Sequence, residues 1–397
     1  MSNDGSSRIK VIFCGRCIPH YRKKLYEHLQ ENKNCDIRVY SNPSDKGVET
    51  ISEDEFASVG GVAAKTFELK IPFRKNWITF QRRVVWAMIC GRARVFVMSP
   101  DFLRPSVWSN LLLSTVLPGK VCLWGHGFSR PETKLSCVLR KIMFGLAGAV
   151  VVYSKKTKDM WVQRGTPKEK IFVAYNTINT EEVFGVKNLL AEDDIERFKA
   201  EQGLAGKKIM LFSGRMHERK RPELLLEVLK RICDDVEDAY LVYIGDGYLL
   251  DDLKRRALEM RLSDKVRFCG AVYDQETLGK YFLSSRVMVI PAAAGLAVQH
   301  AFAYGLPVII GDDFRTHGPE ADIVIDRETG YLCGSGNVDD FAEKVTEILR
   351  DDAIHDRMSR NSVRMIEQEY NVRVQSDTLL RAIRYAAFKV EGRSVCD

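Results

Sequence analysis

Short runs of apolar residues alternate along the chain with longer stretches in which apolar positions recur every three or four residues. The short runs are typical of buried parallel strands, and the longer stretches are typical of amphipathic helices. In the first half, strands are predicted at Arg8–Cys14, Cys35–Tyr40, Arg94–Met98, Lys120–Trp124, Ala149–Tyr153 and Ile171–Ala174. Helices are predicted near Tyr21–Gln30, Trp77–Ile89, Pro105–Val116, Thr133–Leu146 and Lys155–Arg164. Strands and helices in alternation predict a Rossmann-like α/β unit.

The second half repeats this order and predicts a second α/β unit. Its strands are predicted at Lys208–Ser213, Ala239–Gly247, Val266–Val272, Val287–Pro291 and Leu306–Ile310. Helices near the end of the chain are predicted at Val338–Arg350, Ala353–Glu369 and Val372–Val390. Residues 180–206 are charged and are predicted to form a loop-like connection. We therefore predict one domain over residues 1–185, a second over 186–370 and a C-terminal helix within 371–397.

The segment Leu211–Glu223 places a glycine and two cations where a predicted strand passes into a helix. Gly214 lets the backbone approach a ligand closely, while Arg215 and Lys220 can bind phosphate oxygens. The helix is predicted to begin near Pro222, and free backbone N–H groups at a helix start attract anions. These features predict a diphosphate site. A solvated run of basic residues is the alternative.

Three other segments lie at predicted strand ends, where ligands gather in parallel sheets. They are Gly15–His20, Ser99–Asp101 and Trp124–Gly127. Flanking glycines let His126 stand clear of its strand end with little steric crowding. A structural histidine bonded to a neighbouring carbonyl group is the alternative.

Cys14 and Cys17 have the two-residue spacing of redox and metal motifs. A zinc site would need a second pair of ligands, and His20 is the only nearby addition, so no metal is expected. The ten cysteines are scattered, mostly inside predicted strands and helices. That distribution fits reduced thiols in a cytosolic compartment, and we expect a cytoplasmic protein.

The chain has 397 residues, 45% of them hydrophobic, which is enough for two domains with proper cores. It carries 60 Lys and Arg against 53 Asp and Glu, a net charge of +7 that favours an acidic ligand or an anionic surface. No signature of nucleic-acid binding is present. Met1–Arg8 has no apolar core and is predicted to be a loose tail rather than a signal peptide. No apolar run approaches the ~18 residues that a membrane span requires.

Residues Phe73–Trp86 interleave basic and aromatic side chains on a predicted helix. Such a mixture suits a bilayer surface or an anionic lipid-linked acceptor. A core helix with a solvated basic face is the alternative.

The second half carries a series of motifs in a fixed order. They are SGR-x4-K ending at Lys220, IGDG ending at Gly247, VRFCGAV ending at Val272, a Gly-rich loop at Gly295, and AFAYGLPVI ending at Ile309. In order and spacing they resemble glycosyltransferase family 4, strongly over residues 205–350 and weakly in the first half. The resemblance implies an α/β fold of two Rossmann-like domains facing each other across a cleft (GT-B). It also implies acceptor binding by the first domain, nucleotide-sugar binding by the second, and a last helix that crosses back to the first domain.

The resemblance carries roles onto individual residues. It implies that Arg215 and Lys220 bind the donor diphosphate, that His126 faces the donor sugar as the catalytic candidate and that Asp274 lies near the base. The other positions it implies in donor binding are Gly15, Gly214, Gly245, Asp246, Gly295, Leu296 and His300.

Two positions depart from the family pattern, which has glutamates where this chain has Ala292 and His300. His300 can still hydrogen-bond a ribose hydroxyl, although a solvated or structurally satisfied histidine is the alternative. Glu320, in a nearby loop, is a candidate replacement for the lost carboxylates, and its alternative is a plain helix-start glutamate.

We therefore expect a glycosyltransferase that moves a sugar from a nucleotide diphosphate sugar to a hydroxyl of a glycan or lipid-linked acceptor. The resemblance implies retention of anomeric configuration. The sequence has no Asp-x-Asp triplet, which fits a reaction without metal or other cofactor. Two alternatives stay open: a nucleotide-sugar epimerase of the same fold, and a donor-binding pseudoenzyme or assembly subunit.

Overall fold

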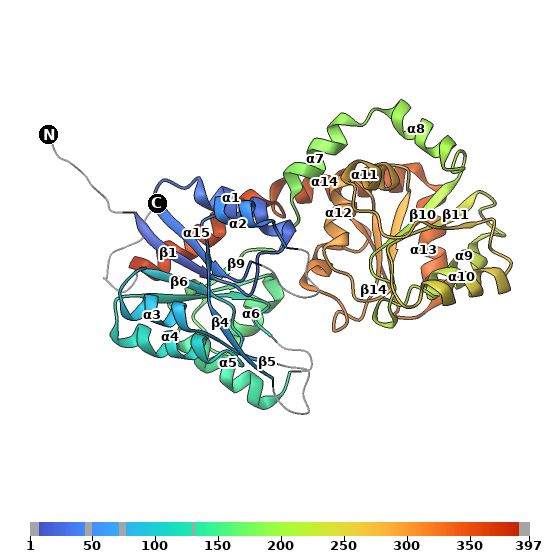
Figure 1. The fold of residues 1–397 in the computed structure, drawn as a ribbon. Coiled ribbons are helices and arrows are strands. Elements are labelled where there is room, and N and C mark those ends of the chain that lie inside the picture. Colours follow the sequence, from blue (N-terminus) through green and yellow to red (C-terminus); the bar gives the residue numbers. More distant parts are fainter. Residues whose placement is uncertain (1–7, 44–49, 71–76, 129–131, 389–397) are drawn as a thin grey trace. The chain divides into compact units, whose positions relative to one another are not determined.

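The computed structural model describes residues 8–43, 50–70, 77–128 and 132–388. The chain divides into two compact units, of which one comprises Met1–Tyr175 with Val372–Asp397 and the other Asn176–Asn371. The division falls before residue 185 because that position lies inside α7 (Thr180–Leu189), which packs on α11 and α12 of the second unit. Figure 1 labels many of the elements of these units and colours the chain from blue at the N-terminus to red at the C-terminus.

In the N-terminal unit, the described residues form a seven-stranded parallel sheet with the order β3-β2-β1-β6-β7-β8-β9. The strands are β1 (Ile9–Cys14), β2 (Cys35–Ser41), β3 (Gly61–Ala63), β6 (Val95–Met98), β7 (Lys120–Gly125), β8 (Ala149–Val152) and β9 (Ile171–Val173). Because all pairs are parallel, the carboxyl ends of these strands meet at one edge of the sheet.

Helices cover both faces of this sheet. They are α1 (Lys23–Gln30), α3 (Arg82–Ile89), α4 (Pro105–Val116), α5 (Lys134–Leu146), α6 (Lys155–Gln163) and α15 (Val372–Phe388), with the short α2 (Glu53–Ser58) beside β3. Successive side chains of a strand point to opposite faces, so Phe13 of β1 packs with α1 and α15 while Ile12 belongs to the core with α3, α4 and α5. The last helix thus completes the core of the N-terminal unit.

In the second unit, the described residues form a six-stranded parallel sheet with the order β12-β11-β10-β13-β14-β15. The strands are β10 (Lys208–Ser213), β11 (Ala239–Ile244), β12 (Val266–Phe268), β13 (Val287–Ile290), β14 (Val308–Gly311) and β15 (Gly330–Cys333). The helices are α7, α8 (Glu192–Glu201), α9 (Leu224–Ile232), α10 (Leu250–Glu259), α11 (Gln275–Leu283), α12 (Ala297–Tyr304), α13 (Val338–Arg350) and α14 (Asp352–Gln368). Together the two parallel sheets confirm the predicted α/β class with two Rossmann-like units.

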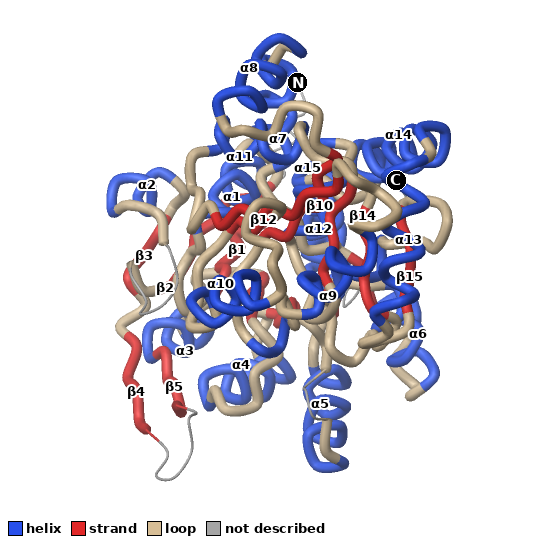
Figure 2. Tube along the Cα trace, turned by 90° about the vertical axis from the view of Figure 1, so that its right-hand side faces the viewer, coloured by secondary structure: helices blue, strands red, loops and turns tan. Residues whose placement is uncertain are grey.

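The predicted helix Trp77–Ile89 is wrong in its first part. Residues Trp77–Gln81 form strand β5, which pairs antiparallel with β4 (Thr66–Lys70), and α3 begins only at Arg82. The sequence Trp-Ile-Thr-Phe consists of aromatic and β-branched residues, which fit an extended strand better than a helix. Figure 2 shows this hairpin extending away from β2 and β3. Of the basic and aromatic segment Phe73–Trp86, the positions before Trp77 lie outside the described residues.

The predicted loop at residues 180–206 is also wrong, because it contains helices α7 and α8. The Asn179 side chain caps α7 by accepting a hydrogen bond from the Glu182 N–H. Helix α8 begins with three acidic residues, which interact favourably with the positive end of the helix dipole. The high charge of this segment therefore reflects exposed helices. Among the helices of the described residues, none is both long and apolar enough to cross a bilayer.

Helix α15 generates a stability prediction. Leu379 is fully buried against the N-terminal sheet, so Leu379→Ala is expected to lower the free energy of unfolding by about 2–5 kcal/mol, as core truncations do. Asp377 lies on the exposed side of the same helix, and Asp377→Ala should change it by less than about 0.5 kcal/mol. Urea denaturation of both variants measures the difference. Equal stability of the two would show that α15 does not contribute to this core.

Candidate functional site

The strand ends of the N-terminal unit surround a cavity of about 590 Å³. The loops after β1, β6 and β7 line it, and they contribute Gly15, Asp101 and His126. All three segments singled out at predicted strand ends therefore meet at this one cavity. The reason is topological, since β1, β6 and β7 are adjacent parallel strands.

Glycines on both sides hold His126 at the end of β7. A Cβ at Gly125 would lie 2.8 Å from the Pro100 ring, and a Cβ at Gly127, where φ is +73°, would lie 2.7 Å from a Thr157 methyl group. The Gly127 carbonyl accepts a 2.7 Å hydrogen bond from the Trp161 indole N–H. His126 itself is exposed and packs edge to face on Tyr153 at a centroid distance of 4.9 Å. The loop is therefore fixed while the imidazole stays accessible.

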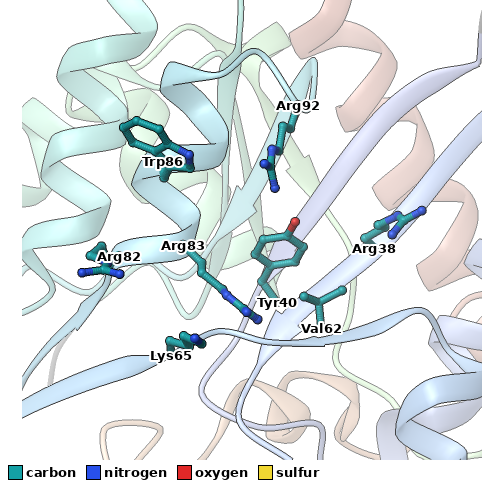
Figure 3. Close-up of a pocket in the computed structure, with 8 residues that line it drawn as sticks. All are labelled: Arg38, Tyr40, Val62, Lys65, Arg82, Arg83, Trp86 and Arg92. Atoms are coloured by element: carbon teal, nitrogen blue, oxygen red, sulfur yellow. The ribbon is translucent and has the colours of Figure 1, made fainter.

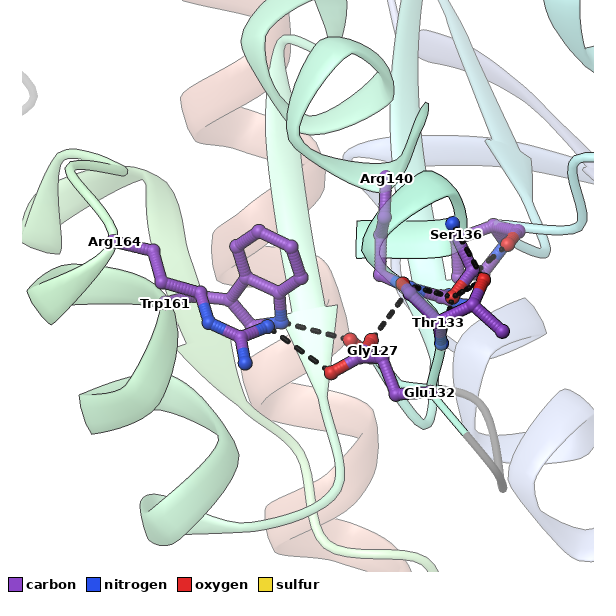
Figure 4. A network of polar contacts seen from close by, with 8 residues as sticks. Gly127, Glu132, Thr133, Ser136, Arg140, Trp161 and Arg164 are labelled. Atoms are coloured by element: carbon purple, nitrogen blue, oxygen red, sulfur yellow. Dashed lines mark hydrogen bonds and ion pairs between the residues drawn. The ribbon is translucent and has the colours of Figure 1, made fainter. Parts of the chain in front are cut away.

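A network of polar contacts surrounds Gly127, the residue after His126 (Figure 4). Glu132 pairs with Arg164 at 3.1 Å, and Arg164 lies over the Trp161 ring at 5.0 Å. Arg140 is buried and donates to the Pro100 carbonyl at 3.3 Å. Burial is the main cause that lowers the pKa of Arg140, while the nearby Glu132 acts in the opposite direction. These contacts connect α5 and α6 to the segment that carries His126.

Sequence reasoning missed a cationic and aromatic cluster in this cavity. The Arg22 guanidinium lies 4.6 Å over the Trp124 ring and donates a 2.8 Å hydrogen bond to the Tyr153 hydroxyl. Among the described residues, no partner bonds the buried Nε of Arg22 or the indole N–H of Trp124. Arg22 directly precedes α1 in a segment of mixed polarity, where the sequence contains no pattern typical of a ligand site. Only its contacts with Trp124 and Tyr153 identify it as a residue of the cavity.

The charge of this cavity is predominantly positive. Among the described residues, its charged lining residues are Arg16, Arg22, Arg104, Arg140 and Asp101. Asp101 pairs with Arg104 at 3.1 Å, which leaves an excess of guanidinium groups. A cavity lined by one sign of charge concentrates ligands of the opposite sign. The arrangement suits an anionic ligand with hydroxyl groups.

In the second unit, two glycine turns lie directly against one another at the ends of β10 and β11. Gly214, Gly245 and Gly247 have φ of +148°, +133° and +156°. A Cβ at Gly245 would collide with the Gly214 carbonyl group, and one at Gly247 would collide with the Met216 carbonyl group. Asp246 supports the second turn, because its carboxylate accepts a 2.7 Å bond from the Gly247 N–H. The fold itself therefore requires glycine at positions 245 and 247 of the IGDG motif.

Lys220 and Arg215 differ in their surroundings. The Lys220 ammonium donates a 2.8 Å hydrogen bond to the Ala293 carbonyl, and its side chain passes close to Gly214, where a Cβ would lie 3.2 Å from Lys220 Cε. Burial is the main cause that lowers the pKa of Lys220, Arg219 lowers it further, and Glu320 raises it. Arg215 is exposed, and within the described part of the chain its guanidinium has no hydrogen-bond or ion-pair partner. Lys220 is thus not part of a solvated charge run.

The helix after these residues begins later than the sequence indicates. Residues Glu218–Lys220 form a short 3-10 turn, Arg221 adopts a left-handed conformation with φ +53°, and α9 begins at Leu224. The N–H groups of the first turn donate to preceding carbonyl groups, at 3.3 Å for Leu224, 3.2 Å for Leu225 and 3.1 Å for Leu226. These three N–H groups of the helix start are therefore not free to bind an anion. The cationic side chains of the preceding turn remain as anion ligands.

Glu320 is buried in the first turn of a short 3-10 helix, Pro319–Ile323, and not in a loop. The residues just before this helix are tied to the segment containing Ala293. The buried His317 accepts a 3.0 Å hydrogen bond at Nδ1 from the Ala294 N–H, so its Nε2 carries the proton and donates to the Gly311 carbonyl at 2.9 Å. Glu320 accepts a 2.8 Å bond from the Asn176 amide. Asn176 is therefore a partner of this carboxylate. Glu320 lies near enough to Lys220 to affect its pKa.

The remaining predicted donor residues have other contacts. Asp274 caps α11 by accepting a 2.8 Å bond from the Thr277 N–H, and bonds to Thr277 lower the pKa of Asp274. The His300 ring packs edge to face on Phe282 at 6.1 Å, and burial lowers the pKa of His300 to about 4. His300 is therefore neutral at pH 7 and can offer a ligand a hydrogen bond but no charge.

The loop before α12 carries Gly295 and Leu296. Gly295 does not need to be glycine for packing, because a Cβ there would meet no atom within 4 Å and its φ is not in the left-handed region. The Leu296 carbonyl accepts bonds from the Gln299 and His300 N–H groups and so begins α12. Gly295 thus differs from Gly245, whose conformation the fold requires.

The Cys14–Cys17 motif does not have the features of a reactive pair. Cys14 is buried, its thiol donates to the Ile12 carbonyl at 3.7 Å, and burial raises the pKa of the Cys14 thiol. A buried thiol with a raised pKa is not a reactive thiolate. Within the described ranges, no group of three or more His, Cys, Asp or Glu residues is arranged to hold a metal ion.

Residues 194–365 match the family model described as Glycosyl transferases group 1. N-acetyl-alpha-D-glucosaminyl L-malate synthase of Bacillus anthracis is 24% identical over 209 residues, which are 51% of this chain and 51% of that protein. Spore coat protein SA of Bacillus subtilis is 26% identical over 197 residues, which are 47% of this chain and 51% of that protein. The chain thus spans about half the length of these curated relatives.

Solved structures are similar over almost the whole chain. A glycosyltransferase from Rickettsia africae has a TM-score of 0.72 at 15% identity, over 96% of this chain and 99% of that one. HepE of Anabaena in complex with UDP has a TM-score of 0.67 at 12% identity, over 95% and 100%. A Listeria monocytogenes protein assigned as a UDP-N-acetylglucosamine 2-epimerase has a TM-score of 0.62 at 16% identity, over 95% and 96%. The chain therefore has the two-unit α/β fold of GT-B proteins, and its residues 194–365 are similar to Glycosyl transferases group 1.

Proposed function

We propose that this chain is a glycosyltransferase that moves a sugar from a nucleotide diphosphate sugar to an acceptor hydroxyl. The proposal rests above all on Lys220, a partly buried ammonium beside the glycine turn at Gly214, in the segment that matches Glycosyl transferases group 1. The neutral Ala293 carbonyl that it now binds is a weaker partner than a phosphate oxygen. An arriving diphosphate can therefore replace it.

In this mechanism, negative charge grows on the leaving nucleoside diphosphate as the glycosidic bond breaks. In this proposal Lys220 and Arg215 stabilise that charge, which lowers the barrier to bond breaking. His126, exposed on its fixed loop, contacts the donor sugar in this proposal. We propose that the reaction is metal-independent because the two side chains supply the charge, and that it retains anomeric configuration as in glycosyltransferase family 4.

The acceptor is proposed to be a glycan or a lipid-linked saccharide. Its negative groups would be bound by the arginine-rich cavity that contains Arg22 and Arg104. Uridine nucleotides are the first donors to test, because HepE of Anabaena, which has a similar fold, was solved with UDP.

A peripheral bilayer contact is also proposed for the N-terminal unit. Helix α5 exposes Leu135 and Val138 at 68% and 54%, and the exposed Lys134 and Lys141 lie on the same helix. Apolar side chains next to lysines suit the surface of an anionic membrane, where each lysine contributes about 1 kcal/mol.

A nucleotide-sugar epimerase is the second candidate, and the similar fold of the Listeria protein favours it. A pseudoenzyme that binds donor without turnover is the third, and it is favoured by the absence of glutamate at Ala292 and His300. Incubation with a panel of UDP sugars and saccharide acceptors, followed by mass spectrometry and chromatography, separates the three. Transfer or hydrolysis supports the proposal, an epimerised donor supports the second candidate, and binding alone supports the third.

The phosphate role is tested by Arg215→Ala and Lys220→Ala. Each is expected to lower turnover about 100-fold or more, because a preorganised donor to the developing charge is lost. Arg219→Ala is the matched control, since Arg219 is an exposed cation in the same turn and should retain near-normal activity. Release of nucleoside diphosphate measures turnover, and thermal melting verifies the fold. Near-normal turnover of both test variants would refute the role.

The close approach of the protein backbone to the donor is tested by two glycine substitutions. Gly295→Ala is expected to preserve the melting temperature but to weaken nucleotide binding about tenfold, because the added methyl group occupies open space where a phosphate would lie. Gly245→Ala should instead lower the melting temperature by several degrees, because of its collision with Gly214. Isothermal calorimetry with UDP and differential scanning fluorimetry give the two readouts. Unchanged binding by the Gly295 variant would exclude contact at this loop.

The bilayer contact is tested by co-sedimentation with vesicles containing phosphatidylserine. Leu135→Ser with Val138→Ser should reduce the bound fraction at least threefold, because apolar area available for insertion is lost. Leu189→Ser with Leu258→Ser removes two exposed leucines from the second unit and should leave binding unchanged. If the wild-type chain does not sediment with these vesicles at low salt, the membrane proposal fails.

A further inference from the structure

A second cavity of the N-terminal unit, of about 780 Å³, lies over β2 and β3 beside helix α3. Among the described residues, its lining consists of five cations and three other side chains, namely Arg38, Lys65, Arg82, Arg83, Arg92, Tyr40, Val62 and Trp86. None of these described lining residues is acidic. We call this cavity the basic groove. A smaller cavity of about 260 Å³ shares Arg38, Tyr40 and Arg92 with it and adds Lys10 and Asp36.

The cations of the basic groove come from separate elements and converge. Figure 3 shows Tyr40 in the middle of the group, with Arg83 extending toward it from α3 and Arg92 from the loop that follows. Tyr40 is buried and forms the floor, whereas Trp86 is 57% exposed at the rim. The groove thus combines a ring of positive charge with two aromatic surfaces.

The positive charges of the basic groove are not balanced within the described residues. Arg38, Lys65, Arg82 and Arg92 have no hydrogen-bond or ion-pair partner for their charged groups there, and Arg83 donates only to the Ala63 carbonyl at 2.7 Å. This contrasts with the salt bridges on most of the surface helices, such as that between Arg256 and Asp252 at 2.7 Å. Like charges brought together without counter-charges repel one another and destabilise the folded chain.

Two local features of the basic groove further destabilise the folded chain. Arg82 and Arg83 occupy the first turn of α3, which has no acidic residue and no side-chain cap, so their charges oppose the helix dipole. Lys65 adopts a left-handed backbone conformation with φ +50°, which is unfavourable for a residue other than glycine. Several unfavourable arrangements in one concave place are accounted for if an anion binds there.

We propose that the basic groove binds a ligand carrying at least two phosphate groups. Guanidinium groups match phosphate oxygens with paired hydrogen bonds, and four of the five cations are arginines. Trp86, exposed at the rim, offers a ring face to a sugar or cyclitol that bears the phosphates, while Tyr40 forms the floor beneath the cations' side chains. The site lies entirely within the N-terminal unit and goes beyond the proposed donor site, which belongs to the second unit.

Such phosphates could belong to a soluble phosphate ester or to the headgroup of a phosphorylated lipid, and both have the same recognition chemistry. Tripolyphosphate is the probe for the soluble form. Vesicles of phosphatidylcholine with phosphatidylinositol 4,5-bisphosphate are the probe for the lipid form, compared with phosphatidylserine vesicles of equal charge.

The test variant is Arg38→Gln with Arg92→Gln, two exposed positions whose substitution should not lower the melting temperature. The matched control is Lys33→Gln with Lys168→Gln, which removes two charges from exposed positions of the same unit outside the groove. Both pairs are made in the Arg215→Ala, Lys220→Ala background, so that the proposed donor site does not contribute. Failure of this inference is then separate from failure of the proposed function.

Calorimetric titration with tripolyphosphate is expected to show at least tenfold weaker binding by the test variant and less than twofold weaker binding by the control. Selective loss of binding to bisphosphate vesicles, with phosphatidylserine vesicles unaffected, would support the inference and assign the ligand to a lipid. Loss with tripolyphosphate alone would support it and assign the ligand to a soluble ester. Equal affinities of test and control variants for both probes, or no binding by the background chain, would overturn it.

Discussion

The ammonium group of Lys220 sets the constraint on which the candidate donor site depends. An ammonium group that leaves water must keep a hydrogen-bond partner, and here that partner is the Ala293 carbonyl at 2.8 Å. The bond connects the turn after β10 to the loop after β13, and His317 connects that loop in turn to the one after β14. Three neighbouring strand ends are thus held together around one cation, close to the carboxylate of Glu320.

Close backbone packing complements this polar framework. The turns at Gly214 and Gly245 approach so closely that no side chain fits between them. In the other unit, Gly125 and Gly127 likewise leave no space for a side chain and so fix the position of His126. In both units, glycine determines where the backbone lies, and the charged or polar side chains take their positions from it. Gly295 stands apart, since neither its conformation nor its neighbours require glycine.

Positive charge is distributed over three separate places, although the net charge of the chain is only +7. One is the turn at Arg215 and Lys220, one is the cavity with Arg22 and Arg104, and one is the basic groove. Where cations lie on exposed helices, they are commonly paired with carboxylates three or four residues away. Within the described residues, Arg215 and four cations of the basic groove, Arg38, Lys65, Arg82 and Arg92, have no such partner for their charged groups.

The sequence by itself determined most strands and helices, because buried strands and amphipathic helices have distinct apolar periods, and it placed Gly214, Lys220 and His126 at strand ends. It did not reveal that Trp77–Gln81 is a strand or that residues 180–206 contain two helices, since pairing with β4 and packing on the second unit decided those segments. Tertiary structure alone decided the partners of Lys220, the neutral state of His300 and the gathering of Arg38, Arg83 and Arg92. Burial and hydrogen-bond partners depend on which distant segments meet, and a linear pattern does not contain that information.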